Sequence, residues 1–417
     1  MKIGIAQLNP IIGDINYNAE KIAAVAHIAA QQGIELLLTP ELSLCGYPPK
    51  DLLLYPAFIN SLQAKLLELA KIIPPELSLL VGTVEVNPTA LQKGQKPLYN
   101  SIALLRQGKI EQIFHKRLLP NYDVFDEHRY FAPGAENNYF FLNRQKIGVT
   151  ICEDLWNDEQ FWGKRYYEVN PIAELAKLEV DIMINLSASP YYCQKQQLRE
   201  AMLAHVTHTY HKPIIYVNQV GANDDLIFDG FSVALNATGE IVARAKSFET
   251  DLVVVEYDVN TNKLINPAPQ PIRELTGENW QYQELFSALV LGVKDYTQKC
   301  GFQRAVFGLS GGIDSALVAI IATAALGTEN VLAVLMPSPY SSQHSIKDAK
   351  ELVANLGINS EIIPIEAGMK AFDQMLHPLF AGTEFGVAEE NIQSRLRGNI
   401  LMAISNKFGH LLLSTGN

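Results

Sequence analysis

A glycine turn between an apolar strand and an apolar helix constrains this chain more than any other stretch. Residues 305–309 have the pattern of a buried strand, the chain turns at Ser310-Gly311-Gly312, and an Ala/Leu/Ile-rich helix follows from about Asp314 to residue 326. The glycines permit a tight turn and a close approach of the backbone to a ligand, and a helix N-terminus offers unpaired N–H groups and a positive dipole end. The stretch therefore predicts a phosphate site, although it contains neither a Walker loop nor Gly-x-Gly-x-x-Gly.

The string Ser-Gly-Gly-Ile-Asp-Ser at 310–315 resembles the pyrophosphate loop of the N-type ATP pyrophosphatases, which cleave ATP between its α and β phosphates to adenylate an oxygen atom. Two glycines alone would favour an ordinary strand–helix turn, whereas the whole string between a strand and a helix favours nucleotide binding. Asp314 suits a helix cap or a metal contact. The resemblance assigns ATP binding to Gly308, Leu309, Ser310, Gly311, Gly312, Ile313, Asp314 and Ser315.

Length and composition predict a globular protein of two to three domains. The chain has 417 residues, 48% of them hydrophobic and 18% charged, with a net charge of −11. The negative charge argues against a nucleic-acid partner. The longest apolar run, 316–326, is much shorter than the roughly 20 residues of a membrane span, so we expect no membrane association. The first residues already form a strand pattern, which indicates no signal peptide.

The cysteines favour a reducing compartment. Cys45, Cys152, Cys193 and Cys300 lie far apart and form no Cys-x-x-Cys pair, so neither a disulfide framework nor a zinc site is expected. Together with the missing signal peptide, this predicts a cytoplasmic protein.

The first part of the chain mixes parallel β-α units with hairpins, which predicts an α/β sandwich with sheets inside and helices outside. It contains too many strands for a simple doubly wound sheet. The predicted strands are 2–8, 36–39, 79–85, 101–106, 109–115, 146–152, 181–186, 214–219, 231–236, 240–245 and 252–257, and the predicted helices are 18–32, 55–72, 170–177 and 195–211.

A proline-rich stretch at 266–273 separates this part from a second α/β pattern and predicts an extended linker. We expect domains at 1–258 and 280–417, with the linker at 259–279. The second domain alternates strands and helices as a doubly wound parallel sheet does, with strands at 305–309, 331–337, 360–365 and from 410. The chain stops at the carboxyl end of that last strand, where such sheets bind ligands, so we expect this domain to be incomplete.

Three reactive side chains stand at predicted strand ends in the first domain. Cys152 ends one strand, Glu41 follows another, and Lys116 follows a third. A nucleophilic thiol needs a base and a nearby cation, which Glu41 and Lys116 would supply. Each residue also has an ordinary alternative: a buried cysteine, a solvated carboxylate, and a basic cluster with Arg117.

The segments Thr39-Pro-Glu41-Leu, His115-Lys116-Arg-Leu-Leu-Pro and Ile151-Cys152-Glu-Asp-Leu-Trp resemble the three catalytic segments of the nitrilase, or carbon–nitrogen hydrolase, superfamily over residues 1–258. The resemblance implies an α-β-β-α sandwich. It makes Glu41 the general base, Lys116 the oxyanion-stabilising residue and Cys152 the nucleophile that forms a thioester. Glu127 resembles the family's supporting glutamate.

A histidine base or metal cluster is the alternative. His205, His208 and His211 recur every third residue on a predicted helix. This spacing drifts around the helix, and no carboxylate joins the three on a shared face, so we favour Glu41 as the base.

A nitrilase-like amidase joined to an adenylating loop resembles the glutamine-dependent NAD⁺ synthetases. The resemblance implies that ammonia released from glutamine amidates deamido-NAD⁺ after ATP, with Mg²⁺, has adenylated its carboxylate. It also implies a homo-oligomer formed through the synthetase domain. Matching positions are Tyr122, Ser189 and Lys195 for glutamine, Asn391 for deamido-NAD⁺ and Thr415 for ATP; the metal ligands stay unassigned.

Three other hypotheses remain. Another glutamine amidotransferase with the same ATP loop would carry a different amidase domain. A stand-alone amidase with a non-productive nucleotide-binding domain would hydrolyse glutamine regardless of ATP. A non-catalytic nucleotide sensor would bind nucleotide without any glutaminase activity.

Overall fold

Two β-sheets lie face to face in the first of two units, Met1–Leu285 and Phe286–Asn417, into which the computed structural model divides. The structure describes residues 1–269, 272, 275–384 and 386–415. The division at 285/286 falls inside helix α7 (Glu278–Lys299). The domain boundaries expected at 258 and 280 stay predictions.

The first sheet combines parallel and antiparallel strands. Within the described residues its order is β15-β14-β1-β2-β3-β4-β5. Strand β2 is parallel to both β1 and β3, and all other neighbouring pairs are antiparallel. Its strands are β1 (Lys2–Gln7), β2 (Leu36–Leu38), β3 (Ser78–Val86), β4 (Leu98–Arg106), β5 (Lys109–His115), β14 (Asp251–Asp258) and β15 (Lys263–Ile265).

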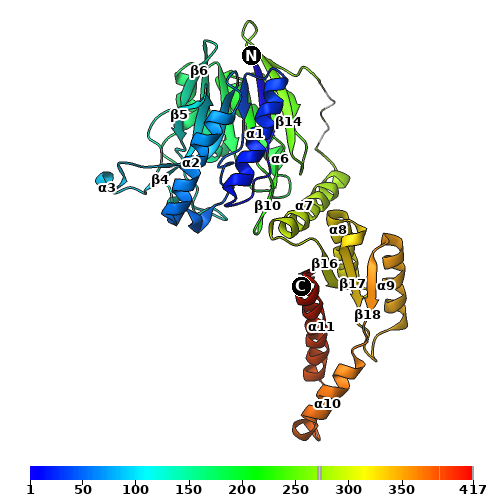
Figure 1. Ribbon diagram of the computed structural model, residues 1–417. Coiled ribbons are helices and arrows are strands. Elements are labelled where there is room, and N and C mark those ends of the chain that lie inside the picture. The colour runs from blue at the N-terminus through cyan, green and yellow to red at the C-terminus, as the bar shows by residue number, and fades with distance from the viewer. Residues whose placement is uncertain (270–271, 273–274, 385, 416–417) are drawn as a thin grey trace. The chain divides into compact units, whose positions relative to one another are not determined.

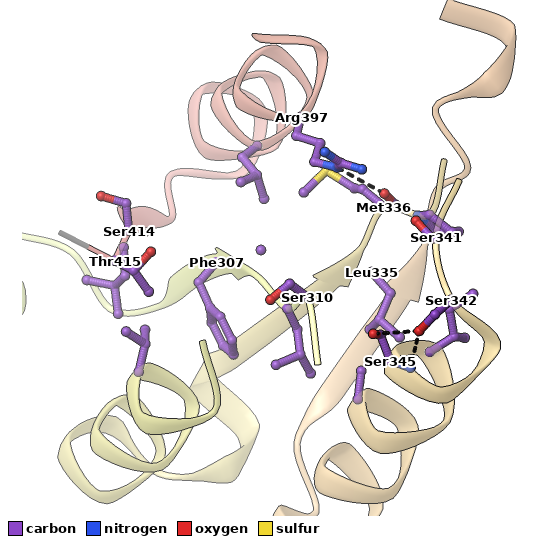
Figure 2. A pocket seen from close by; sticks show the side chains of 18 residues that line it. Phe307, Ser310, Leu335, Met336, Ser341, Ser342, Ser345, Arg397, Ser414 and Thr415 are labelled. Atoms are coloured by element: carbon purple, nitrogen blue, oxygen red, sulfur yellow. Dashed lines mark hydrogen bonds between the residues drawn. The ribbon is translucent and has the colours of Figure 1, made fainter. Parts of the chain in front are cut away.

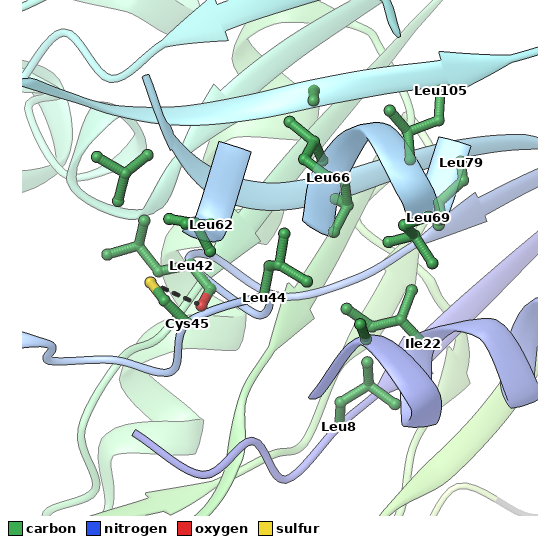
Figure 3. Close-up of a cluster of buried hydrophobic side chains, with 14 of the residues drawn as sticks. Leu8, Ile22, Leu42, Leu44, Cys45, Leu62, Leu66, Leu69, Leu79 and Leu105 are labelled. Carbon is green, nitrogen blue, oxygen red and sulfur yellow. Dashed lines mark hydrogen bonds between the residues drawn. The ribbon is translucent and has the colours of Figure 1, made fainter. Parts of the chain in front are cut away.

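Strand β2 shows why the two faces of this sheet are both buried. Side chains alternate along a strand, so Leu37 packs toward the helices while Leu36 and Leu38 pack toward the second sheet. Helices α1 (Ile15–Gln31) and α2 (Pro56–Ile72) cover the helix side and contact each other (Figure 1). Figure 3 shows this apolar layer, in which Ile22 of α1 and leucines 62, 66 and 69 of α2 meet Leu79 and Leu105 of the sheet.

The second sheet has the order β13-β12-β9-β8-β7-β6 within the described residues. Helices α5 (Pro171–Lys177) and α6 (Lys195–Tyr210) pack on its outer face through Leu175, Met202 and Val206. The layers therefore run helix, sheet, sheet, helix, which confirms the predicted α-β-β-α sandwich. The strands are β6 (Tyr139–Leu142), β7 (Gln145–Ile151), β8 (Ile182–Ser187), β9 (Ile214–Asn218), β12 (Val233–Leu235) and β13 (Ile241–Arg244).

Several elements of this unit were not predicted. The hairpin β6–β7 turns at Asn143 and Arg144, whose φ values are +49° and +68°. Glycine usually occupies the second position of such a turn, so the sequence with Arg144 there did not indicate a hairpin. Strand β15 lies in the predicted linker 259–279 and pairs antiparallel with β14. The other unpredicted elements are β10 (Val220–Asn223), β11 (Leu226–Asp229), α3 (Ala90–Lys93), α4 (Glu159–Trp162) and the 3₁₀ turns η1 (Lys50–Leu54), η2 (Glu127–Arg129) and η3 (Cys152–Leu155).

The second unit has a parallel sheet of order β18-β17-β16-β19 within the described residues. One face packs on α8 and α9 through Phe307, Ala322 and Ala349, and the other meets α11 through Val306 and Leu401. Helices on both faces confirm the predicted doubly wound sheet. Its elements are β16 (Ala305–Gly308), α8 (Ile313–Leu326), η4 (Thr328–Asn330), β17 (Val331–Leu335), α9 (Gln343–Leu356), β18 (Asn359–Ile362), α10 (Glu366–Phe380), α11 (Val387–Phe408) and β19 (Leu411–Leu413).

Among the helices that the structure describes, each is too short or too polar to traverse a lipid bilayer.

Candidate active site

The three predicted reactive residues follow strands that belong to two different sheets. Glu41 follows β2 and Lys116 follows β5 in the first sheet, whereas Cys152 follows β7 in the second. Adjacency of strands within a single sheet therefore does not bring them together. The residues meet because the two sheets are stacked with these strand ends at a shared edge.

Lys116, Glu41 and Glu127 form a buried ionic cluster. The Lys116 Nζ lies 2.7 Å from Glu41 Oε1 and 2.7 Å from Glu127 Oε1, and none of the three side chains is more than 5% exposed. Such a cluster excludes the hypothesis that Lys116 and Glu41 are solvated surface charges. Glu127 belongs to the same cluster through its contact with Lys116, and its supporting role stays a prediction.

Further donors hold the two carboxylates in place. Glu41 accepts hydrogen bonds from Asn100 Nδ2 at 2.7 Å and from the backbone N–H of Ala188 at 3.0 Å. Glu127 accepts one from the Tyr47 hydroxyl at 2.9 Å. A carboxylate bound on several sides has a fixed orientation, which a general base requires.

The cluster holds one positive and two negative charges. Burial lowers the pKa of Lys116, but Glu127 and Glu41 together outweigh it and hold that pKa well above its usual value. Burial, aided by the charge of Glu41 and opposed by Lys116, raises the pKa of Glu127 to about 7. The ammonium therefore stays charged, and uptake of a proton by Glu127 would make the cluster neutral.

Cys152 has the geometry of a strained nucleophile. It opens η3 with φ at +42°, in the left-handed region, where a residue with a side chain is conformationally strained. Burial and the charge of Glu41 raise the pKa of its thiol well above the usual value, against the opposing effect of Lys116. The resting sulfur is therefore protonated, so its attack requires a base to remove the proton.

A cavity of about 610 Å³ opens onto this thiol. Four of the residues predicted for catalysis or glutamine binding line it together: Tyr122, Cys152, Ser189 and Lys195. Glu41 and Lys116 are fully buried, Glu127 is 4% exposed, and none of the three lines this cavity.

Glu153 also lines this cavity and was not predicted. The Tyr122 hydroxyl donates to both of its carboxylate oxygens at 3.1 and 3.0 Å, and the Tyr167 hydroxyl donates at 3.0 Å. Its position directly after Cys152 was the available sequence signal. Tyr122 therefore orients a buried anion at the cavity wall.

Lys195 supplies the opposite charge. Its Nζ lies 5.5 Å from the ring centre of Trp156 and 4.8 Å from that of Tyr192. Burial, reinforced by the charge of Arg199, lowers the pKa of Lys195 to about 8. A cation at one point of the cavity and an anion at another suit a zwitterionic ligand.

The three histidines of α6 do not form a metal site. His205 Nε2 lies 3.6 Å from Asp158 Oδ1, and His211 ends the helix with φ at +54°. Throughout the described residues, no group of three or more His, Cys, Asp or Glu side chains is arranged to hold a metal ion.

The glycine loop of the second unit is held by its own serines. The Ser315 hydroxyl contacts both the backbone N–H and the hydroxyl of Ser310, at 3.2 and 3.1 Å, and donates to the carbonyl of Gly312 at 3.0 Å. Gly311 has φ at +85°. Ile313 and Asp314, in the first turn of α8, are exposed.

A cavity of about 390 Å³ lies beside this loop at the carboxyl end of the sheet (Figure 2). Gly308, Leu309, Ser310 and Thr415, four of the residues assigned to ATP by resemblance, line it, whereas residues 311–315 do not. Gly416 and Asn417, which follow Thr415 in the sequence, lie outside the described residues. Further lining residues that the sequence did not indicate are Met336, Ser341, Ser342, Ser345 and Arg397, whose Nε donates to the Met336 carbonyl at 3.1 Å.

Asn391 lies apart from this cavity. It is exposed on α11, between Glu389 and Ile392, which line a different cavity of about 310 Å³. Its assignment to deamido-NAD⁺ stays a prediction.

Gly311→Ala is expected to destabilise the second unit by about 1–3 kcal/mol and to weaken ATP binding. An added Cβ would lie 2.2 Å from the Ser345 carbonyl oxygen, in a backbone conformation that alanine disfavours. Gly312→Ala is the matched control, because its φ is −86° and its nearest contact is the Ser310 hydroxyl at 3.3 Å. Thermal unfolding with and without ATP compares the two. Equal stability of both variants would contradict the close approach of Gly311 to the backbone of Ser345 in α9.

Two family models match the chain in succession. Residues 2–265 match the carbon–nitrogen hydrolases and residues 285–417 match NAD synthase. A nitrilase-superfamily amidase from Nesterenkonia, 19% identical, shares the fold of the first unit with a TM-score of 0.50 over 61% of this chain and 89% of its own. Fold and site thus define a carbon–nitrogen hydrolase unit joined to an NAD synthase unit.

Full-length relatives carry both units. The chain is 57% identical to the glutamine-dependent NAD(+) synthetase of Synechocystis and 40% identical to that of Thermotoga maritima, covering 100% of this chain and 74% of each relative. The glutamine-dependent NAD⁺ synthetase of Acinetobacter baumannii, solved with ADP, is 39% identical with a TM-score of 0.90, again over 100% of this chain and 74% of that one. The chain belongs to the glutamine-dependent NAD⁺ synthetase family.

Proposed function

We propose that the first unit hydrolyses glutamine through a thioester on Cys152. The observation that carries this proposal is the buried Glu41–Lys116–Glu127 cluster directly beneath a thiol-lined cavity. Lys195 would bind the α-carboxylate of glutamine, and Glu153, oriented by Tyr122, would bind the α-ammonium. Ser189 lies at the same wall and would complete the pocket.

Glu41 takes the thiol proton as the sulfur attacks the amide carbon, and the Lys116 ammonium stabilises the negative charge that develops on the amide oxygen. The C–N bond then breaks, the amide nitrogen leaves as ammonia with the proton returned by Glu41, and the acyl group stays on sulfur. Water, deprotonated by Glu41, hydrolyses the thioester to glutamate and restores the thiol.

The second unit would use ATP to activate the nicotinate carboxylate of deamido-NAD⁺. A carboxylate is a poor electrophile at neutral pH, and its attack on the α phosphate of ATP releases pyrophosphate and leaves an acyl-adenylate. Ammonia then displaces AMP and forms the amide of NAD⁺. The loop 308–315 and Thr415 would hold the ATP, and Asn391 would contact deamido-NAD⁺.

Mg²⁺ fits this site as an ion held mainly by phosphate oxygens. Asp314 offers one exposed carboxylate in the first turn of α8, and one or two carboxylates with phosphates and water are the usual arrangement for this ion. When bound, Mg²⁺ would neutralise phosphate charge.

We place the protein in the cytoplasm as a homo-oligomer. Its four free cysteines suit a reducing compartment. The second units of two copies of the chain would associate through exposed apolar side chains, namely Leu289 on α7 and Leu317 and Ile320 on α8. Light scattering after size-exclusion chromatography measures the mass, and a monomer at micromolar concentration would contradict the association.

A single assay tests the proposed function. The full-length enzyme is supplied with ATP, deamido-NAD⁺ and either glutamine or ammonia, and AMP, pyrophosphate, NAD⁺ and glutamate are measured. Equal amounts of AMP, pyrophosphate and NAD⁺ with both nitrogen sources are expected. Glutamate without AMP would support a stand-alone amidase, and nucleotide binding with neither product would support a sensor.

A pH profile tests the role of Lys195. Because the pKa of Lys195 is lowered to about 8, its ammonium is lost as the pH rises through that value, and kcat/KM for glutamine is expected to fall there. Lys195→Arg keeps the charge, so the decline should move to higher pH. The titration of free glutamine is common to both enzymes and cancels in the comparison. The same decline in both would exclude Lys195 as the cause.

A further inference from the structure

Asp154, two residues after the proposed nucleophile, is a buried carboxylate without a role so far. It is 1% exposed. Its Oδ2 accepts the backbone N–H of Ile151 at 3.0 Å, and its Oδ1 accepts those of Arg117 at 3.0 Å and Leu118 at 2.8 Å. Burial raises the pKa of Asp154 to about 6 against the effect of these donors, so at neutral pH the group is ionised.

The two oxygens of this side chain bind segments of different sheets. Ile151 ends β7 and precedes Cys152, whereas Arg117 and Leu118 directly follow Lys116 beyond β5. Stacked sheets share no backbone ladder, so their packing alone leaves the offset between two strand ends loosely set. A carboxylate bridging both backbones fixes that offset one residue away from each reactive side chain.

We propose that Asp154 is a positioning residue that holds the Lys116 segment in register with the Cys152 turn. The inference rests on the proposed roles of Cys152 and Lys116. Asp154 need not touch the substrate: it sets where the developing oxyanion lies relative to the ammonium. The ammonium itself is already held by Glu41 and Glu127, so a shift of the backbone would move sulfur and cluster apart without removing any catalytic group.

Asparagine cannot reproduce the bridge. An amide has one acceptor oxygen, and its NH₂ group would face an N–H donor on the other side. Asp154→Asn therefore keeps the size of the side chain but leaves one of the two segments unbound, with an unsatisfied buried N–H.

The experiment measures glutamine hydrolysis by the full-length enzyme. Asp154→Asn is expected to lower kcat about 100-fold, because a displacement near 1 Å between the Cys152 turn and the Lys116 segment has an effect of this size. KM for glutamine is expected to stay within about threefold of the wild-type value. Asp158→Asn is the matched control: this carboxylate is 4% exposed and caps α4 through the N–H of Gln160, which an asparagine oxygen can still accept. The control is expected to keep the wild-type kcat.

Each other result decides against the proposal. A kcat for Asp154→Asn within threefold of wild type would overturn it, and so would a rise in KM alone or an equal loss in Asp158→Asn. If Asp154→Asn does not fold, Asp154→Glu, which keeps both oxygens but displaces them by one methylene, is expected to fold with a lowered kcat. Failure of both variants to fold would assign Asp154 to stability alone. An inactive wild-type enzyme would instead contradict the proposed function.

Discussion

Cys152→Ala is expected to reduce glutamine hydrolysis at least 10⁴-fold, about to the background rate, because no other group in the cavity can form the thioester. The full-length variant should still make NAD⁺ from free ammonia, since adenylation is proposed to occur in the second unit. The measurement compares NAD⁺ formation with each nitrogen source in the same preparation.

The second buried cysteine of the first unit provides the control. Cys45 is fully buried, its sulfur contacts the carbonyls of Leu42 and Gly46, and burial raises its pKa to about 12. Cys45→Ala should therefore lose some stability and keep glutamine-dependent synthesis. Loss of ammonia-dependent synthesis in Cys152→Ala would contradict two separate sites, and retained glutaminase activity would exclude the thiol as nucleophile.

Lys116→Met is expected to lower kcat for glutamine hydrolysis by about 10²–10³-fold, because the methionine keeps most of the length of the side chain but removes the charge that faces the developing oxyanion. The structure indicates a loss of about 3–5 kcal/mol in unfolding free energy, since two buried carboxylates would remain without their cation.

The pH dependence of stability separates these two effects. Without the ammonium, the folded-state pKa of Glu127 should rise further above its unfolded value, so the variant gains stability relative to wild type as the pH falls. Adding Glu127→Gln to Lys116→Met removes one of the unpaired charges and should recover part of the stability but none of the activity. Recovery of activity would show that Lys116 acts through folding alone.

An exposed lysine gives the comparison for this variant. Lys50 pairs with Asp224 at 2.7 Å on the surface, where such pairs contribute about 1 kcal/mol or less. Lys50→Met should therefore leave both kcat and the unfolding free energy close to wild type. Denaturant unfolding between pH 5 and 8 and steady-state kinetics measure both quantities in each variant.

Local patterns in the sequence predicted most of the strands and helices that the structure shows. The unbroken apolar run Leu36–Leu38 indicates a strand buried on both faces, and the glycine string at 310–312 marks the strand–helix turn that the structure has. Where the local signal was atypical the prediction failed, as at Arg144, which occupies a left-handed turn position that glycine usually takes.

The sequence by itself determined the two α/β units, their order, and the residue types available for thiol and nucleotide chemistry, because periodicity and turn chemistry act between near neighbours. Only the tertiary structure decided that Lys116 lies between Glu41 and Glu127 and that Asp154 joins the ends of β5 and β7. Those contacts form only when the two sheets stack, and they join residues that lie far apart in the sequence. For the same reason, the carboxylate of Glu153 became a candidate ligand group only when the fold brought Tyr122 and Tyr167 to it.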